Sequence, residues 1–403
     1  MDVLKLASIF LLGSRRNFIG KDEAEAWSDQ ILDELGLSKG LKFLVRREEE
    51  ILEINIHGID GFIVFPYCSN RFSPLIYLAE TKLPIIIYGK GETFCHALDT
   101  YEYLSDHKNV EIAFDQAELK RKIDNIQTLK WFEKTKICLF DFGDWTLSGA
   151  AWLKNPLVSR KLNIQNINKE EFLEVYKNVD KEKAESLARK WINEAEQVLE
   201  PTFEEIVKAA TVYLAMKTTM ENMKANAAYV LWCGQFTKEL GTKMCFALAK
   251  LADDGYPVGC WRGENLLPLL ILHTVSKKPI FVCEAFLREG KVISLKHCFA
   301  PTIIASRKYI LRRWRNMKGT VTGYCQLPQG EVTLVNCGIG DKIVVCKGQV
   351  IDCKDLGGDN CRITVWVKLE NEEAIHQFVG REFAMVYGDY EKEAKQLGKM
   401  LGM

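Results

Sequence analysis

The sequence predicts an α/β fold: two Rossmann-like, doubly wound units followed by a C-terminal α+β region that contains an antiparallel β-barrel. Short apolar runs alternate with amphipathic helical stretches from Leu4 to Phe114. A second series of the same kind begins at Lys136, and short runs separated by Gly and Asp turns begin near Gly319. Strands that alternate with helices indicate parallel sheets, whereas closely spaced strands indicate antiparallel pairing.

The first region contains five apolar runs of strand length, separated by helical stretches such as Lys21–Leu35 and Leu75–Thr81. The predicted strands are Leu4–Leu12, Leu41–Arg46, Gly61–Pro66, Pro84–Tyr88 and Val110–Phe114. This alternation predicts an N-terminal Rossmann-like domain over residues 1–134.

A second α/β domain is expected over 135–230, together with part of 231–318. Its predicted elements are a buried strand from Lys136, a strand over Leu162–Ile167, helices over Glu170–Lys177, Lys181–Leu199 and Thr202–Met223, and a strand from Ala227.

The C-terminal region, residues 319–403, is expected to be barrel-like. Its predicted strands are Glu331–Val335, Lys342–Cys346, Gln349–Cys353 and Arg362–Leu369, and an amphipathic helix follows over Tyr390–Leu401.

The charge balance gives no general attraction to nucleic acid or to a membrane surface, because Lys+Arg and Asp+Glu are 54 each. The local exception is the basic run Arg307–Lys318. It is interpreted either as a solvated helix face or as a contact for a phosphate or a partner. We therefore expect neither nucleic acid nor membrane among the partners.

The cysteines favour a cytoplasmic protein. There are 13, an odd number, and no Cys-x-x-Cys pair occurs. Most lie inside apolar runs, as buried thiols of the cytosol do. The apolar N-terminal stretch contains Asp2 and lacks a small-x-small cleavage site, so it is interpreted as a first strand rather than a signal peptide. The longest apolar run elsewhere, Leu266–Val275, is too short to cross a bilayer.

Four polar residues lie at the edges of apolar elements and are candidates for a metal site: Glu264, Glu284, His297 and Glu382. Carboxylates with one imidazole suit Mn²⁺, with Mg²⁺ or Co²⁺ as substitutes. Each residue also has a purely structural interpretation. Glu264 could favour a helix N-terminus, Glu284 could cap an exposed strand end, and His297 could be a core histidine. Glu382 could pair with the adjacent chain or with Arg381.

Three motifs in the C-terminal half resemble one family. They are His297-Cys-x-Ala-Pro301, Gln326-Leu-Pro-x-Gly-x-Val-Thr-Leu334 and Val386-Tyr-Gly-Asp-Tyr390. Together with the segment Gly241–Glu264 they are similar to the L-fucose/L-arabinose isomerase family, and the chain is fucose isomerase-like. The resemblance covers residues from Asn226 to the C-terminus, and the N-terminal region matches in element order only.

The chain departs from the family at several polar positions. It has Cys260-Trp-Arg-Gly-Glu264 where the family has Cys-Glu-x-Asp, and Arg381-Glu382 where related sequences have Asn-His. A further His and a Glu of the family are lost within Arg312–Met317. These changes add Arg262, Arg315 and Arg381, with Trp261, as candidate substrate-binding residues. Guanidinium groups favour an anionic sugar.

The resemblance implies a carbohydrate (aldose–ketose) isomerase that acts through a metal-bound enediolate. Glu264 and Glu284 would be the catalytic acid/base pair, and Glu264, Glu284, His297 and Glu382 would hold the metal. It also implies a homo-oligomer, a trimer or hexamer. The alternative is a non-catalytic sugar-binding or regulatory protein on the same scaffold, and a third possibility is an enzyme of another class.

Overall fold

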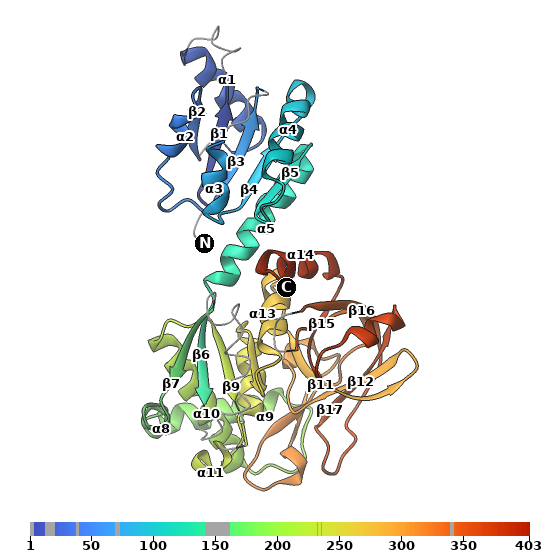
Figure 1. Cartoon of the computed structure of the whole chain (residues 1–403). Helices are drawn as coiled ribbons and strands as arrows, with labels where there is room; N and C mark the ends of the chain where they lie inside the picture. The colour runs from blue at the N-terminus through green and yellow to red at the C-terminus, as the bar shows by residue number, and fades with distance from the viewer. Residues whose placement is uncertain are drawn as a thin grey trace. The chain divides into compact units, whose positions relative to one another are not determined.

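The computed structural model describes residues 4–12, 21–37, 40–68, 73–141, 162–231, 233–234, 236–338 and 342–403. The chain divides into two compact units, Met1–Lys130 and Trp131–Met403. The finer predicted division of the second unit, at residues 230 and 319, stays a prediction. Each unit is described by itself, with the labels of Figure 1.

The first unit is built on a parallel five-stranded sheet with the order β2-β1-β3-β4-β5. Its strands are β1 (Leu6–Leu11), β2 (Leu41–Val45), β3 (Gly61–Pro66), β4 (Ile85–Tyr88) and β5 (Val110–Ala113). The three central strands are buried on both faces, as their unbroken apolar runs require.

Helices cover both faces of this sheet. They are α1 (Lys21–Glu34), α2 (Glu49–Leu52), α3 (Leu75–Glu80), η2 (Gly91–Thr93), α4 (Phe94–Leu104) and α5 (Gln116–Glu133). Alternate residues of β1 enter two separate cores: Ile9 packs in the cluster that contains Leu78 and Leu104, and Phe10 in the cluster that contains Leu32 and Leu119. The period of two along a strand therefore divides the core into two layers.

The second unit contains a parallel sheet with the order β10-β9-β6-β7. Its strands are β6 (Lys136–Asp141), β7 (Asn163–Ile167), β9 (Ala227–Leu231) and β10 (Val258–Trp261). Its helices are α8 (Lys169–Lys177), α9 (Lys181–Glu194), α10 (Phe203–Asn222), α11 (Phe236–Leu240) and α12 (Cys245–Asp253). A reciprocal capping box between Thr202 and Glu205 begins α10.

The predicted barrel is confirmed as a closed, six-stranded antiparallel structure with the order β11-β12-β17-β16-β15-β18. The strands are β11 (Phe281–Glu289), β12 (Val292–His297), β15 (Gly330–Asn336), β16 (Val344–Lys354), β17 (Ile363–Leu369) and β18 (Glu382–Tyr387). The helices η5 (Glu372–Gln377) and α14 (Glu391–Leu401) complete this region.

Two predicted strands are one strand, β16, because Lys347 and Gly348 continue the ladder with β15. Gly348 is required by close packing: a Cβ there would lie 2.7 Å from Val367 Cγ1 and 2.9 Å from the Lys368 carbonyl oxygen.

The prediction of a helix face over Arg307–Lys318 is wrong. The run forms β13 (Ile310–Arg312) and the single turn η4 (Trp314–Asn316), in a small sheet with β8 (Gln197–Val198) and β14 (Thr322–Tyr324). The predicted helix Lys181–Leu199 ends at Glu194 for the same reason, since β8 pairs with β13. A further turn, η3 (Thr302–Ile304), precedes β13.

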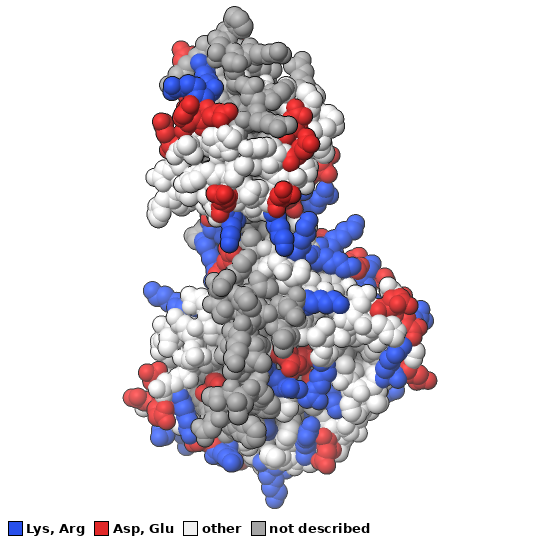
Figure 2. Space-filling model, in the orientation of Figure 1, with Lys and Arg blue, Asp and Glu red and all other residues white. Residues whose placement is uncertain are grey.

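Helix α13 (Leu266–Ser276) lies between the parallel sheet and the barrel of the second unit (Figure 1). It contacts β10 on one side and β15 and β18 on the other. Among the described residues, no helix is long and apolar enough to cross a membrane. Figure 2 shows basic and acidic side chains interspersed over the visible face of this unit.

Candidate active site

The candidate site begins where β10 ends, in the turn from Trp261 to Glu264 that leads into α13. Trp261 has φ 106° and Gly263 has φ 99°, so the turn uses a backbone conformation that bulky side chains avoid. A tryptophan in this region costs on the order of 1–3 kcal/mol, and such strain persists only where the surroundings impose it. Strained residues of this kind are concentrated at functional sites, so this turn is a candidate part of one.

Tyr229 holds the turn in place from the neighbouring strand β9. Its side chain is completely buried. The phenol oxygen accepts a hydrogen bond from the Gly263 backbone N–H at 3.0 Å and donates one to Asn265 Oδ1 at 2.6 Å. The parallel register between β9 and β10 brings Tyr229 to this position. The carboxylate of Glu264 is thereby carried on a rigid, hydrogen-bonded support.

The barrel contributes two more carboxylates to the same place. Glu284 on β11 is directly opposite Glu382 on β18, so the two side chains share one face of the barrel wall. The Asn265 backbone N–H donates to Glu382 Oε2 at 3.1 Å. Glu264 Oε2 lies close to the backbone of Gly380, 3.3 Å from where a Cβ would stand. The three predicted glutamates therefore converge.

Glu382 is the most perturbed of these groups. It is 1% exposed, and its Oε1 has no hydrogen-bond partner among the described residues. Burial, followed by the negative charges of Glu264 and Glu284, raises the pKa of Glu382 to about 8. It therefore holds its proton at neutral pH and can release it close to neutrality. A buried acid of this kind beside two carboxylates suits general acid/base catalysis.

Two of the predicted arginines accompany the outer carboxylates. Arg262 Nη2 is 3.7 Å from Glu264 Oε1, and Arg381 Nη2 is 3.7 Å from Glu284 Oε2. The arginine side chains are 37% and 51% exposed, so these ion pairs are weak and can be exchanged for another anion. The glutamates are 20% and 16% exposed, whereas Glu382 is buried.

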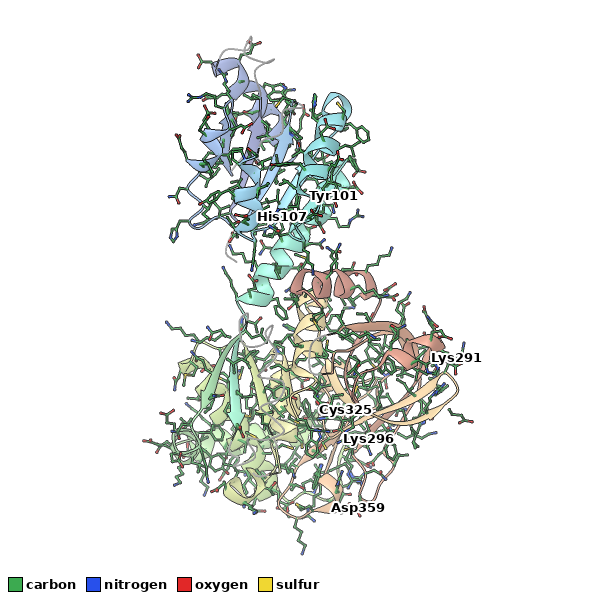
Figure 3. All side chains as sticks on the ribbon, viewed as in Figure 1. Tyr101, His107, Lys291, Lys296, Cys325 and Asp359 are labelled. Carbon is green, nitrogen blue, oxygen red and sulfur yellow. The ribbon has the colours of Figure 1, made fainter. Side chains whose placement is uncertain are left out.

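His297 does not join the carboxylates, which corrects the predicted ligand set. Glu284 is opposite Lys296 in the ladder between β11 and β12, so the two side chains share one face of the barrel wall. Lys296 is labelled in Figure 3. His297 is the next residue along β12 and therefore belongs to the other face of the barrel wall. The imidazole is buried, with Nε2 3.8 Å from Cys260 Sγ, and burial lowers its pKa to about 4. It is a neutral core histidine.

The described residues do not fit the predicted Mn²⁺ site. No group of three or more His, Cys, Asp and Glu among them is placed to hold a metal ion. Each of the two outer carboxylates lies beside a guanidinium group, and the imidazole lies on the other face. The predicted coordination through Glu264, Glu284, His297 and Glu382 is therefore not assembled.

The remaining predicted residues divide between two places. Trp261, in the strained turn, belongs to the candidate site. Arg315 packs on the ring of Trp314, 4.7 Å from the centroid, and its charge acts on Cys233 and Cys361. Its predicted role in substrate binding has no support from these contacts.

The sequence prediction missed Tyr229 and Asn265. Tyr229 lies inside an apolar strand with nothing to mark it as polar. Asn265 had a visible signal, since it precedes the apolar helix α13 at the N-cap position. Comparison with known proteins adds no assignment: no protein-family model matches this chain, and no curated protein matches its sequence.

Proposed function

We propose that the chain is a carbohydrate isomerase-like enzyme that interconverts an aldose and a ketose by acid/base catalysis. The single observation that supports this most is Glu382, a buried carboxyl with a pKa of about 8 between two further carboxylates. The interconversion requires one group to move a proton between neighbouring carbons and another to serve the oxygens. Carboxyls whose pKa values differ are suited to these two roles.

The roles follow from burial and charge. An ionised outer carboxylate, Glu264 or Glu284, takes the proton from carbon 2 of the open-chain aldose, while Glu382 donates its proton to the carbonyl oxygen. The carbon-bound proton is then returned to carbon 1, and Glu382 recovers its proton from the oxygen on carbon 2. Arg262 and Arg381 lie beside these carboxylates and would stabilise the negative charge that develops on the oxygens.

The same arginines favour a sugar that carries a phosphate, carboxylate or sulfonate. Each is partly exposed and held by a single loose ion pair, so that an incoming anion can replace its glutamate partner. That exchange would also free the glutamate to act as a base. The Rossmann-like winding of the two parallel sheets and a homo-oligomeric assembly belong to this proposal, because they rest on the family resemblance.

A second function, non-catalytic sugar binding, is favoured by one observation: an arginine lies beside each outer carboxylate. The two functions are separated by incubating the full chain in D₂O with neutral and anionic aldoses, with and without Mn²⁺. Proton NMR then follows exchange of the carbon-2 hydrogen and formation of the ketose.

With an anionic aldose, we expect exchange of the carbon-2 hydrogen and formation of the ketose, both with and without Mn²⁺. Calorimetrically detected binding without exchange would establish the sugar-binding function. Activity that appears only with Mn²⁺ would overturn the roles assigned to the carboxylates and arginines.

A further inference from the structure

Lys243 of the second unit is buried without a carboxylate partner. It lies between α11 and α12 and is only 5% exposed. Among the described residues, its ammonium takes part in no ion pair and no hydrogen bond, and it lies 4.0 Å from the centroid of the Trp314 ring. Lysine is almost never buried without a compensating negative charge, because the ammonium loses its water of solvation there. The position is therefore suited to an anion.

A second cation contacts the same ring from the η4 turn. Arg315 is exposed, and its Cζ lies 4.7 Å from the Trp314 centroid. Among the described residues no carboxylate pairs with it, whereas the other arginines of the basic run are all ion-paired: Arg307, Arg312 and Arg313. Both cation distances end at one centroid, so the two cations cannot be farther apart than the sum of these distances. An oxyanion can bridge such a gap with a charge-assisted hydrogen bond to each cation.

The indole between these cations is held by hydrogen bonds. Trp314 Nε1 donates to Cys298 Sγ at 2.9 Å, and the Trp314 backbone N–H donates to Thr320 Oγ1 at 3.0 Å. The chain after η4 also approaches the segment that leads to the lysine. Gly319 has φ 82°, and a Cβ there would lie 2.9 Å from the Gly241 carbonyl oxygen. The two segments that carry the cations are therefore packed against each other.

The ammonium lies beside an exposed glycine, through which an anion from solvent can approach it. A Cβ built on Gly234 would lie 3.7 Å from Lys243 Nζ, and Gly234 is exposed. Gly234 follows β9, so it is at the carboxyl end of a strand of the parallel sheet. Ligands of α/β sheets bind at this end of the strands.

A second lysine in the same unit shows what is missing at Lys243. Lys250 Nζ also lies over an aromatic ring, 5.4 Å from the Tyr309 centroid, and its side chain is 15% exposed. It pairs with Asp253 at 2.7 Å and with Glu194 at 3.5 Å. The chain therefore supplies carboxylates to one lysine that packs on a ring and supplies none to the other.

We propose that Lys243 and Arg315 bind a phosphate group, either as inorganic phosphate or as a phosphate monoester. A phosphate carries close to two negative charges at neutral pH, which matches two unpaired cations. The arginine supplies a planar, two-pronged donor, and the lysine supplies a compact point charge. The proposal concerns the binding of phosphate alone and does not depend on the proposed function.

The experiment is isothermal titration calorimetry of the full chain at low salt and pH 7.5 with inorganic phosphate, glycerol 3-phosphate and glycerol. We expect both phosphates to bind and to compete with each other, and glycerol not to bind. Tighter binding of glycerol 3-phosphate would identify a phosphate monoester as the ligand, whereas equal or tighter binding of inorganic phosphate would identify the free anion. The proposal is overturned if neither phosphate binds.

Substitutions assign the binding to these two residues. Lys243→Met and Arg315→Gln should each weaken phosphate binding about tenfold or more, because each removes a charge-assisted hydrogen bond. Lys250→Met and Arg307→Gln are the matched controls, since both residues already have carboxylate partners, and they should bind phosphate as the parent does. Equal binding by the parent and the Lys243 and Arg315 variants would overturn the proposal.

A third variant covers the case in which Lys243→Met fails to fold. Gly234→Asp retains the lysine and places a carboxylate within reach of its ammonium. The backbone at Gly234 is not left-handed, and Lys243 Nζ is the only described heavy atom within 4 Å of a Cβ there, so the residue accommodates a side chain. The new carboxylate should compete with phosphate and weaken its binding about tenfold or more. Unchanged phosphate binding in this folded variant would also overturn the proposal.

Discussion

Two charge clusters in the second unit contrast sharply. One is the candidate site of Glu264, Glu284 and Glu382 with Arg262 and Arg381. The other, here called the Arg362 network, joins Arg312, Arg313 and Arg362 to Glu200, Glu205 and Asp355. Arg362 is completely buried, and it donates through Nε to the Arg313 carbonyl oxygen at 2.9 Å and through Nη2 to Asn316 Oδ1 at 2.7 Å.

The pKa values of the carboxyls show the difference. Burial alone would raise the pKa of Glu200 and Glu205, but hydrogen bonds from arginine side chains and backbone N–H groups outweigh it and lower both. In the candidate site, burial and neighbouring carboxylates together raise the pKa of Glu382. The Arg362 network pairs its carboxylates with arginines, whereas the candidate site retains an acid that can still exchange its proton.

The largest effect expected is on activity, from Glu382→Gln. Gln keeps the size of the side chain and removes the exchangeable proton, so ketose formation should fall about 10²–10⁴-fold, the usual contribution of a general acid. The measurement is the initial rate on the anionic aldose that the D₂O experiment selects. Glu289→Gln, at an exposed position on the same barrel, should retain the parent rate. Equal rates for the two variants would remove Glu382 from the reaction.

The next effect is on stability, from Arg362→Met. This change removes the donor to the Arg313 carbonyl oxygen and leaves Asp355 with Arg312 as its remaining ion-pair partner. Removing one member of a buried ion pair destabilises by about 3–5 kcal/mol. Urea unfolding of the full chain measures it. Arg307→Met, which breaks an exposed pair with Glu196, should cost about 0–1 kcal/mol. A small effect at Arg362 would erase the proposed distinction between the clusters.

The raised pKa of Glu382 predicts a pH dependence of stability. Between its ordinary value of 4.5 and the folded value of about 8, the folded chain keeps a proton that the unfolded chain has lost. Stability from this group should therefore fall by about 1.4 kcal/mol per pH unit as the pH rises through this window, and level off above it. Urea midpoints at pH 5, 6, 7 and 8 would reveal the slope. Glu382→Gln should flatten it, and an unchanged slope in that variant would assign it to other groups.

The smallest effect expected is from Tyr229→Phe. The change removes the hydroxyl that bridges Gly263 and Asn265, and leaves two buried polar groups unpaired. The loss should be about 1–3 kcal/mol of unfolding free energy. Tyr256→Phe, at a partly buried position after the turn 254–255 of the same unit, is the comparison. If Tyr229→Phe leaves both stability and activity intact, the turn does not depend on this support.

Elements that depend on neighbouring residues were predicted more accurately than features that depend on residues distant in the sequence. Local patterns located the strands and helices well, because a buried parallel strand such as β4 is an unbroken apolar run and α10 begins with a capping box. The basic run Arg307–Lys318 misled, because its distant partners, Glu200 and Glu205, turn it into a strand and a tight turn. Two arginines of the run are paired with these glutamates, and the sequence alone does not indicate that pairing.

The sequence by itself determined the element order and the antiparallel strands of the barrel. It also identified three glutamates at the ends of elements as candidate site residues. Tertiary structure alone decided that these glutamates meet and that His297 is on the opposite face. Strand register gives the physical reason. A shift of one residue exchanges the two faces of a strand, and only the pairing of β11 with β12 and β18 selects the face.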